Sequence, residues 1–192
     1  MSIIKSRLRL ILLIAVLILP LASWTFFKPI RVLAPELNGV TCITNNICVE
    51  NLSKKEDAKL LYEKSLNFIN NYIGKIENNP RVIFCSSISC FKSFGFHFPA
   101  KAKTVGYFGI VIGPKGWLEI FMRHEMIHYL QVEQLGLYSY VRAPQWFKEG
   151  MAYSLSKDPR ELKKPWSEYR KKFRHWYNRI DKRNLWSEAG NL

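Results

Sequence analysis

Acidic residues are scarce in this sequence of 192 residues. Asp and Glu number 15 against 29 Lys and Arg, so the formal net charge is +14. Such an excess favours a negatively charged partner or surface. Part of it lies in residues 158–183, where ten basic and four acidic residues give a net charge of +6. The simplest interpretation is a solvated basic face, and contact with anionic lipid or cell-wall polymer is favoured over contact with nucleic acid.

The chain contains no internal repeat and no low-complexity tract. Its length therefore suits one modest domain, expected over residues 39–192, together with an N-terminal segment.

One long apolar run without a charge is present, residues 10–27. As a helix it would rise ~27 Å, which is just enough to cross a bilayer. Three basic residues precede it, so the sequence predicts a cytoplasmic tail over 1–9, a transmembrane signal-anchor over 10–27 and a stalk over 28–38. A clean A-x-A cleavage site is missing, which favours an anchor over a cleaved signal peptide. Both alternatives place the domain outside the cytoplasm, in the periplasm or at the cell surface.

Cysteine is also sparse, and none of the four residues belongs to a C-x-x-C spacing. A zinc site built from all four is therefore disfavoured. Cys42 and Cys48 flank the loop of a predicted hairpin, residues 40–49, and lie opposite each other in it. Cys85 and Cys90 close a short loop after a strand. Of three possible pairings, 42–48 and 85–90 are favoured, and such bridges persist only in an oxidising compartment; the alternative is free buried thiols.

Histidine is rare, yet two of the four histidines fall in His124-Glu125-Met126-Ile127-His128. Residues four apart lie one above the other on a helix face, so both imidazoles can reach one metal ion. The H-E-x-x-H pattern is typical of metalloproteases, in which the histidines bind zinc and the glutamate is the general base. The alternative is a chance occurrence on a half-buried helix.

The longer pattern H-E-x-x-H-x-x-G-x-x-H is absent, because Gln131 and Gln134 occupy its glycine and last histidine positions. A hydrolytic zinc site needs three protein ligands and an open position for water, so a third donor is required. Glu149 follows Pro144, which suits the start of a helix, and precedes Gly150, where a neighbouring helix can approach closely. The alternative for Glu149 is an ordinary glutamate favoured by the helix dipole.

The H-E-x-x-H motif followed by W-x-x-E-G-x-A over residues 146–152 resembles the glutamate zincins (gluzincins), the peptidase MA-like group. The resemblance covers residues 121–154, with Phe121 as a departure because the family usually has a smaller residue there. It implies an α+β zincin-like domain with a small sheet, an active-site helix and a glutamate helix. It also implies peptide-bond hydrolysis with one Zn²⁺ held by His124, His128 and Glu149 and with Glu125 as general base.

A second group that stabilises the oxyanion is expected, typically a tyrosine or a histidine. Tyr138 and Tyr140 lie between the predicted ligands, where thermolysin-like enzymes of the resembled group have a tyrosine, and His175 is an alternative. Tyr153, one turn after Glu149, is a candidate for supporting a zinc-bound imidazole.

Apolar spacing and turn residues predict the elements around these motifs. Residues 53–56 read as a capping box, so a helix is expected from residue 53 to about residue 76. The further predictions are strands over 81–84 and 105–112, a metal helix over 117–135 ended by Gly136, a glutamate helix from Pro144, a linker over 158–165 and a docked last helix over 166–180.

Three functional classes fit these observations. The first is a membrane-anchored zinc metallopeptidase acting on peptide or protein substrates. The second is a catalytically degenerate relative that binds zinc for stability, and the third is an envelope module whose basic C-terminal segment contacts lipid or polymer. A nucleic-acid partner is not expected.

Overall fold

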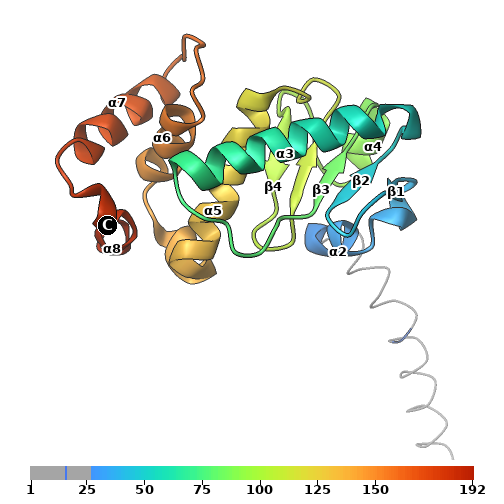
Figure 1. Cartoon of the computed structure of the whole chain (residues 1–192), viewed down its shortest axis with the longest axis horizontal. Helices are drawn as coiled ribbons and strands as arrows, with labels where there is room; N and C mark the ends of the chain where they lie inside the picture. Colours follow the sequence, from blue (N-terminus) through green and yellow to red (C-terminus); the bar gives the residue numbers. More distant parts are fainter. Residues whose placement is uncertain (1–15, 17–26) are drawn as a thin grey trace, which may run out of the picture.

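The computed structural model describes residue 16 and residues 27–192, which form a five-stranded sheet with helices on both faces (Figure 1). The strand order is β1-β2-β3-β5-β4. The three central strands are parallel, and each edge strand is antiparallel to its neighbour. The predicted α+β class is confirmed. The strands are β1 Thr41–Cys42, β2 Ile47–Val49, β3 Val82–Phe84, β4 Ala102–Thr104 and β5 Ile110–Ile112.

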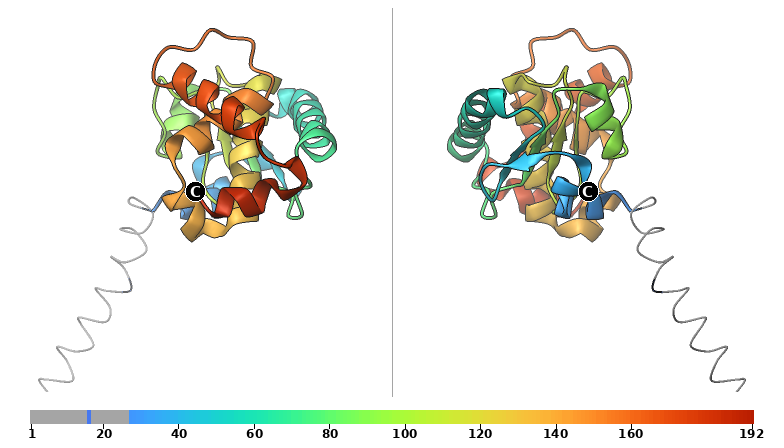
Figure 2. Two further views of the ribbon diagram at one scale, coloured as in Figure 1. Left: turned by 90° about the vertical axis from the view of Figure 1, so that its left-hand side faces the viewer. Right: turned by 90° about the vertical axis from the view of Figure 1, so that its right-hand side faces the viewer.

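Two layers of helices enclose the sheet, one from each side (Figure 2). One layer contains α3 and α5, with α6 to α8 grouped at one end of the domain, and the other contains α2 and α4 (Figure 1). The α-helices are α2 Lys28–Leu33, α3 Lys55–Tyr72, α4 Ile88–Ser93, α5 Glu119–Arg142, α6 Gln145–Leu155, α7 Trp166–Tyr177 and α8 Leu185–Gly190. Three 3-10 turns are η1 Pro35–Asn38, η2 Leu52–Lys54 and η3 Lys182–Asn184.

Every residue of the three central strands is buried, as expected for a parallel sheet covered on both faces. Alternate side chains point to opposite faces of a strand, so the strands contribute to two cores. Val82, Phe84 and Ile112 pack with α3 and α5 in the larger core. Ile83 and Val111 pack with α2 and α4 in the smaller one.

Residues 28–38, predicted as a stalk, fold against the domain as α2 and η1. Val32 is fully buried in the smaller core. The Arg31 guanidinium donates to the Ser93 carbonyl at 2.9 Å, and Arg81 donates to the Leu33 carbonyl at 2.9 Å. This segment is therefore part of the packed structure rather than an extended spacer.

The predicted tail over 1–9 and almost all of the predicted anchor over 10–27 lie outside the described residues. Within the part of the chain that the structure describes, no helix is both long and apolar enough to cross a bilayer.

The capping box predicted over residues 53–56 is wrong. Ser53 lies inside the turn η2, and α3 begins only at Lys55. The Asn51 side chain accepts a hydrogen bond from the Ser53 amide at 2.9 Å, so Asn51 caps the preceding turn instead. The helix ends at Tyr72, before the predicted residue 76, and the Asn70 side chain then accepts the amide of Ile76 at 3.0 Å.

The continuous strand predicted over residues 105–112 is also wrong. The chain turns between β4 and β5, where the Val105 amide donates to the Gly109 carbonyl at 2.8 Å. Gly109 has a φ of 143°, and a Cβ at this position would lie 2.3 Å from the Arg81 carbonyl oxygen. Glycine is therefore required where the chain leaves the turn and enters β5.

The helix α5 starts and ends differently from the prediction. It begins at Glu119, two residues after the predicted start, and helical structure resumes beyond Gly136 to Arg142. Gly136 has φ 76° and ψ 154°, so the regular helix does stop there and the chain kinks. Residues 119–135 thus form the straight part that carries both histidines of the motif.

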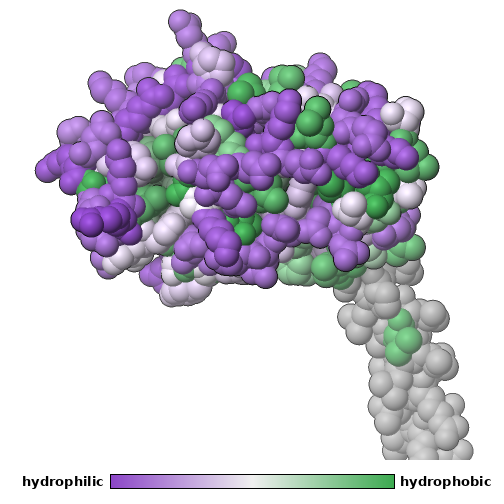
Figure 3. Space-filling model, viewed as in Figure 1, coloured by the Kyte–Doolittle hydropathy of each residue, from purple (hydrophilic) through white to green (hydrophobic). Residues whose placement is uncertain are grey.

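The last predicted helix is confirmed as α7, and its aromatic face is docked on α6. Phe173 is fully buried, and the Phe147 ring lies 6.1 Å from it and 5.4 Å from the Trp176 ring. Lys171 and Arg174 are exposed on α7, and the face of the domain drawn in Figure 3 is largely hydrophilic. The basic side chains therefore face solvent, as expected.

Gly150 permits the close crossing of α6 and α7. A Cβ there would lie 2.3 Å from the Tyr169 carbonyl oxygen and 2.7 Å from the Phe173 Cβ. We expect Gly150→Ala to lower the free energy of unfolding by about 1–3 kcal/mol, because backbone must move to relieve the overlap. Urea denaturation measures this change. Gly190→Ala is the matched control, since a Cβ there meets nothing within 4 Å, and an equal effect of both substitutions would contradict the explanation.

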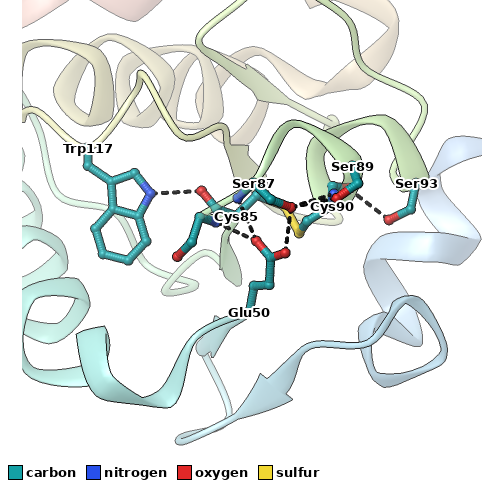
Figure 4. Close-up of a disulfide and its surroundings, with 8 residues drawn as sticks. Glu50, Cys85, Ser87, Ser89, Cys90, Ser93 and Trp117 are labelled. Carbon is teal, nitrogen blue, oxygen red and sulfur yellow. Dashed lines mark hydrogen bonds between the residues drawn. A yellow bond between two sulfur atoms is a disulfide. The ribbon is translucent and has the colours of Figure 1, made fainter.

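Both predicted disulfides are present. Cys42 and Cys48 are paired across β1 and β2 in the register of the hairpin, and Cys85 is bridged to Cys90. The second bridge joins the end of β3 to α4 (Figure 4). Glu50 accepts the amides of Ser86 and Ser87 at 2.6 and 2.7 Å beside it. Glu50 lies near both sulfurs, but sulfurs that are joined in a disulfide are not available as thiolate ligands of a metal ion.

Candidate metal centre

The structure brings His124, His128 and Glu149 together at the meeting of α5 and α6. The Nε2 atoms of the two histidines are 3.1 Å apart. Glu149 Oε2 lies 3.5 Å from His124 Nε2, and its Oε1 lies 3.7 Å from His128 Nε2. One donor atom from each residue therefore falls within 4.8 Å of the others.

These separations fit a single metal ion. Donors bound at zinc distances of about 2.0–2.2 Å in a tetrahedral arrangement lie about 3.3–3.6 Å from one another. The two imidazole nitrogens are 3.1 Å apart, and each lies close to that range from a different oxygen of the Glu149 carboxylate, at 3.5 and 3.7 Å. The side chains of His124, His128 and Glu149 are 12%, 7% and 19% exposed, so a bound ion would be largely enclosed while one side stays accessible. The three residues could hold a metal ion.

Both helices that carry the ligands are packed into the larger core. On α5, Met122, Met126 and Leu130 are fully buried in the larger core. On α6, Phe147 and Met151 are fully buried in the same core. Glu149 lies between them in the sequence, and its side chain faces His124 of α5. Residues 125–132 of α5 are all buried, so this helix is enclosed on every side there, and its two histidines lie on the side that meets Glu149 of α6.

The three groups also form a charged cluster without metal. Burial raises the pKa of the Glu149 carboxyl, but hydrogen bonds and charge from His124 and His128 outweigh it and hold that pKa well below its usual value. Burial lowers the pKa of His128, and the hydrogen bond and charge of Glu149 outweigh this effect and raise it. The site therefore favours an ionised carboxylate beside a positive charge, and a divalent cation would supply that charge in place of a proton.

Gln131 orients one of the histidines. Its Oε1 lies 2.9 Å from His128 Nδ1, and its Nε2 donates to the Lys148 carbonyl at 3.1 Å. Gln131 is fully buried, so it fixes the imidazole and also ties α5 to α6 next to Glu149. In the sequence motifs Gln131 is notable only as a residue that stands where the longer pattern has glycine. Its position three residues after His128, on the same helix face, is the signal that could have identified it.

We expect Gln131→Met to weaken zinc binding by about 10–100-fold, because the imidazole loses the partner that sets its orientation. Methionine retains most of the side-chain volume, so the packing between α5 and α6 is largely kept. Competition with a chelating dye measures the affinity. Gln134→Met on the exposed side of the same helix is the control, and similar affinities for both variants would contradict an orienting role.

Glu125 is held in a different way from the three ligands. It is only 7% exposed, and its Oε2 accepts hydrogen bonds from the Thr104 amide at 2.7 Å and from the Thr104 hydroxyl at 2.8 Å. Thr104 belongs to the edge strand β4, so the sheet positions this carboxylate beside the histidines. Thr104 lies just before the strand predicted over residues 105–112, so the apolar pattern does not indicate this contact.

Two tyrosines flank the histidine pair. The Tyr153 ring contacts His124 edge-on with a centroid distance of 4.5 Å, and the Tyr140 ring lies 6.5 Å from that of His128. Burial is the largest cause that raises the pKa of Tyr153 to about 12, and burial likewise raises the pKa of Tyr140. Both hydroxyls therefore stay protonated at neutral pH and can donate hydrogen bonds.

Tyr138 and His175, the other two candidates for stabilising an oxyanion, make no contact with the three clustered residues in the described part of the chain. Tyr138 is 72% exposed and contacts Arg142. His175 is exposed on α7, with Arg179 3.4 Å away.

A cleft with a volume of about 190 Å³ opens onto the cluster. His124, Glu125 and Glu149 line it together with Tyr153. Its other walls come from three segments: residues 99–103 before and within β4, Phe121 on α5, and Arg160 and Trp166 around the linker that follows α6. A group bound in this cleft would lie against Glu125 and two of the three possible ligands, His124 and Glu149.

We compared the chain with protein-family models, with curated proteins and with solved structures, and none of them matches it. Function is therefore inferred from the side chains of the cleft. The part of the site that the structure shows is a buried group of two histidines and one glutamate that could hold a metal ion, with a further glutamate beside it in an open cleft.

Proposed function

We propose that the protein is a zinc-dependent peptidase of the zincin-like type. The observation that carries the proposal is the convergence of His124, His128 and Glu149 at distances suited to one tetrahedral ion. Two nitrogen ligands and one carboxylate are the donor set of many hydrolytic zinc sites, which keep the fourth position open. In this interpretation α5 is the active-site helix and α6 is the glutamate helix.

In the proposed reaction the ligands His124, His128 and Glu149 would hold the ion. When bound, zinc supplies Lewis acidity at its open position, where water and a carbonyl oxygen can be polarised. Glu125 takes a proton from the attacking water on its carboxylate and then transfers it to the leaving amine, so that the peptide bond is replaced by a carboxylate and an amine. Thr104 keeps the Glu125 carboxylate in position during both transfers.

The negative charge that develops on the carbonyl oxygen needs a hydrogen-bond donor. Tyr153 lines the cleft and contacts His124, so its hydroxyl is the donor that the geometry favours. Tyr140 lies on the side of His128 and does not line the cleft, which makes it the second choice.

We further propose that the domain works outside the cytoplasm, attached to a membrane through residues 10–27. The two disulfides support an oxidising compartment, since such bonds rarely persist in the cytosol. Exposed basic residues on α7 are compatible with a nearby anionic surface.

A cleavage screen tests the proposal. The full chain, purified in mild detergent, is incubated with a pool of peptides before and after removal of metal with a chelator. We expect cleavage products that disappear with the chelator and return with one equivalent of zinc. A protein that binds one zinc ion per chain but cleaves no peptide would instead be the catalytically degenerate form. A protein that binds no zinc would leave only the envelope-surface alternative.

A further inference from the structure

Three basic side chains, Lys101, Lys103 and Arg160, line the same cleft as the possible metal ligands. Basic residues are common on a chain with this net charge, so their presence alone decides nothing. Two further observations matter: contacts with Phe121 hold Lys101 and Arg160 in place, and neither lysine has an acidic partner in the described part of the chain.

Phe121 holds two of these cations at once. The Lys101 ammonium lies 4.4 Å from the centre of the Phe121 ring, and the Arg160 guanidinium lies 4.6 Å from it. Phe121 is itself 8% exposed, so the ring is a fixed part of the wall. Both cationic side chains are therefore placed by the same ring in the lining of the cleft. Phe121 is also the position at which the motif departs from the smaller residue of the resembled family.

Arg160 is fixed further by Asp158. The guanidinium donates to both Asp158 oxygens, through Nε at 2.8 and 3.0 Å and through Nη2 at 2.5 Å. The Asp158 side chain is 1% exposed, so this pair is anchored in the protein rather than free in solvent. No hydrogen bond is made by Arg160 Nη1 to any residue that the structure describes. The guanidinium is thus oriented on one edge and available on the other.

The two lysines lack acidic partners in the described part of the chain. Neither Lys101 nor Lys103 has a carboxylate oxygen within 4.0 Å there. The acidic residues of the cleft are engaged elsewhere, since Glu149 pairs with the histidines and Glu125 accepts from Thr104. An incoming carboxylate would therefore meet two ammonium groups that no carboxylate neutralises, beside the free edge of an Arg160 guanidinium that is paired with Asp158.

We propose that the wall formed by Lys101, Phe121 and Arg160 binds a carboxylate of the substrate next to the bond that is cleaved. This inference rests on the proposed peptidase function and names its substrate class: peptides with an acidic residue, or with a free carboxyl terminus, beside the scissile bond. Arginine presents a rigid fork that suits a carboxylate, and lysine adds a second charge. An acidic side chain and a free carboxyl terminus both supply a carboxylate, and the peptides compared below distinguish between them.

The first arm of the test measures binding alone. Fluorescence anisotropy with zinc-loaded Glu125→Gln protein compares labelled peptides that differ only in Glu against Gln, and in a free against an amidated carboxyl terminus. We expect one of the two carboxylates to strengthen binding about tenfold. Lys101→Met should abolish this difference, whereas Lys171→Gln on the exposed face of α7 should keep it. Equal binding of all peptides would overturn the inference.

Removing Arg160 alone would leave the charge of the buried Asp158 without a partner, so the variant that tests Arg160 must neutralise Asp158 as well. The double substitution Asp158→Asn with Arg160→Gln removes both charges and leaves a polar, uncharged side chain at each position. We expect it to reduce the preference for the acidic peptide by about tenfold with little change for the neutral peptide. Retention of the full preference in both this variant and Lys101→Met would contradict the assignment of the wall.

The second arm measures hydrolysis by the unsubstituted protein with the same peptides. Cleavage without any preference for an acidic substrate would refute this inference and leave the peptidase proposal intact. Selective binding of acidic peptides without cleavage would refute the peptidase proposal and leave the carboxylate site intact.

Discussion

Replacing Glu125 with glutamine is expected to reduce peptide hydrolysis by about 10²–10⁴-fold, the range typical of a lost general base. Glutamine retains the shape of the side chain and an oxygen that can accept from Thr104, whose amide and hydroxyl now donate to Glu125. It cannot take up the proton of the attacking water. Glu125 is not one of the three clustered donors, so zinc content should stay unchanged. Initial rates and metal analysis on the same preparation measure both quantities.

Glu119→Gln provides the matched control for this substitution. Glu119 lies on the same helix, pairs with Arg123 and does not line the cleft. We expect its rate to be close to that of the unsubstituted protein. Equal activity of the Glu125→Gln and Glu119→Gln variants would mean that another group accepts the proton.

The second large effect concerns the third ligand. Glu149→Gln is expected to weaken zinc binding by more than the ~10–100-fold typical of a residue outside the first coordination shell, because an amide oxygen is a much poorer ligand than a carboxylate. Hydrolysis should fall with the bound zinc. Zinc titration against a chelating dye gives the affinity, and circular dichroism confirms that the fold persists.

Glu161→Gln controls for the loss of one negative charge, since Glu161 is exposed and outside the cleft. It should bind zinc as tightly as the unsubstituted chain. If Glu149→Gln behaves in the same way, the glutamate is an ordinary helix residue and a different side chain completes the site.

The histidine pair was predictable from sequence because its information is local. The four-residue spacing of His124 and His128 fixes their common face once a helix forms. Glu149 was assigned through the resemblance in W-x-x-E-G-x-A, since Gly150 marks the crossing of α6 with α7 and not with α5. The disulfides were predictable for the same reason, since a three-residue loop determines the register that pairs Cys42 with Cys48.

The residues that support the cluster were not predictable in this way. Thr104 reaches Glu125 from a strand that begins earlier than the apolar pattern indicated, and the glycine turn that separates β4 from β5 looks like strand in sequence. Arg160 enters the cleft from a linker that carries no periodic signal. Such contacts depend on tertiary packing, which overrides local pattern. The packing of residues 28–38 on the sheet was missed for this reason as well.

X-ray absorption at the zinc edge identifies the atoms that surround a bound ion. We expect one zinc ion per chain, bound by two imidazole nitrogens and by oxygen ligands at about 2.0–2.2 Å, and loss of one imidazole from the spectrum in His124→Ala. A spectrum with sulfur neighbours at about 2.3 Å, or with oxygen ligands and no imidazole, would show that the ion binds elsewhere and would contradict the account.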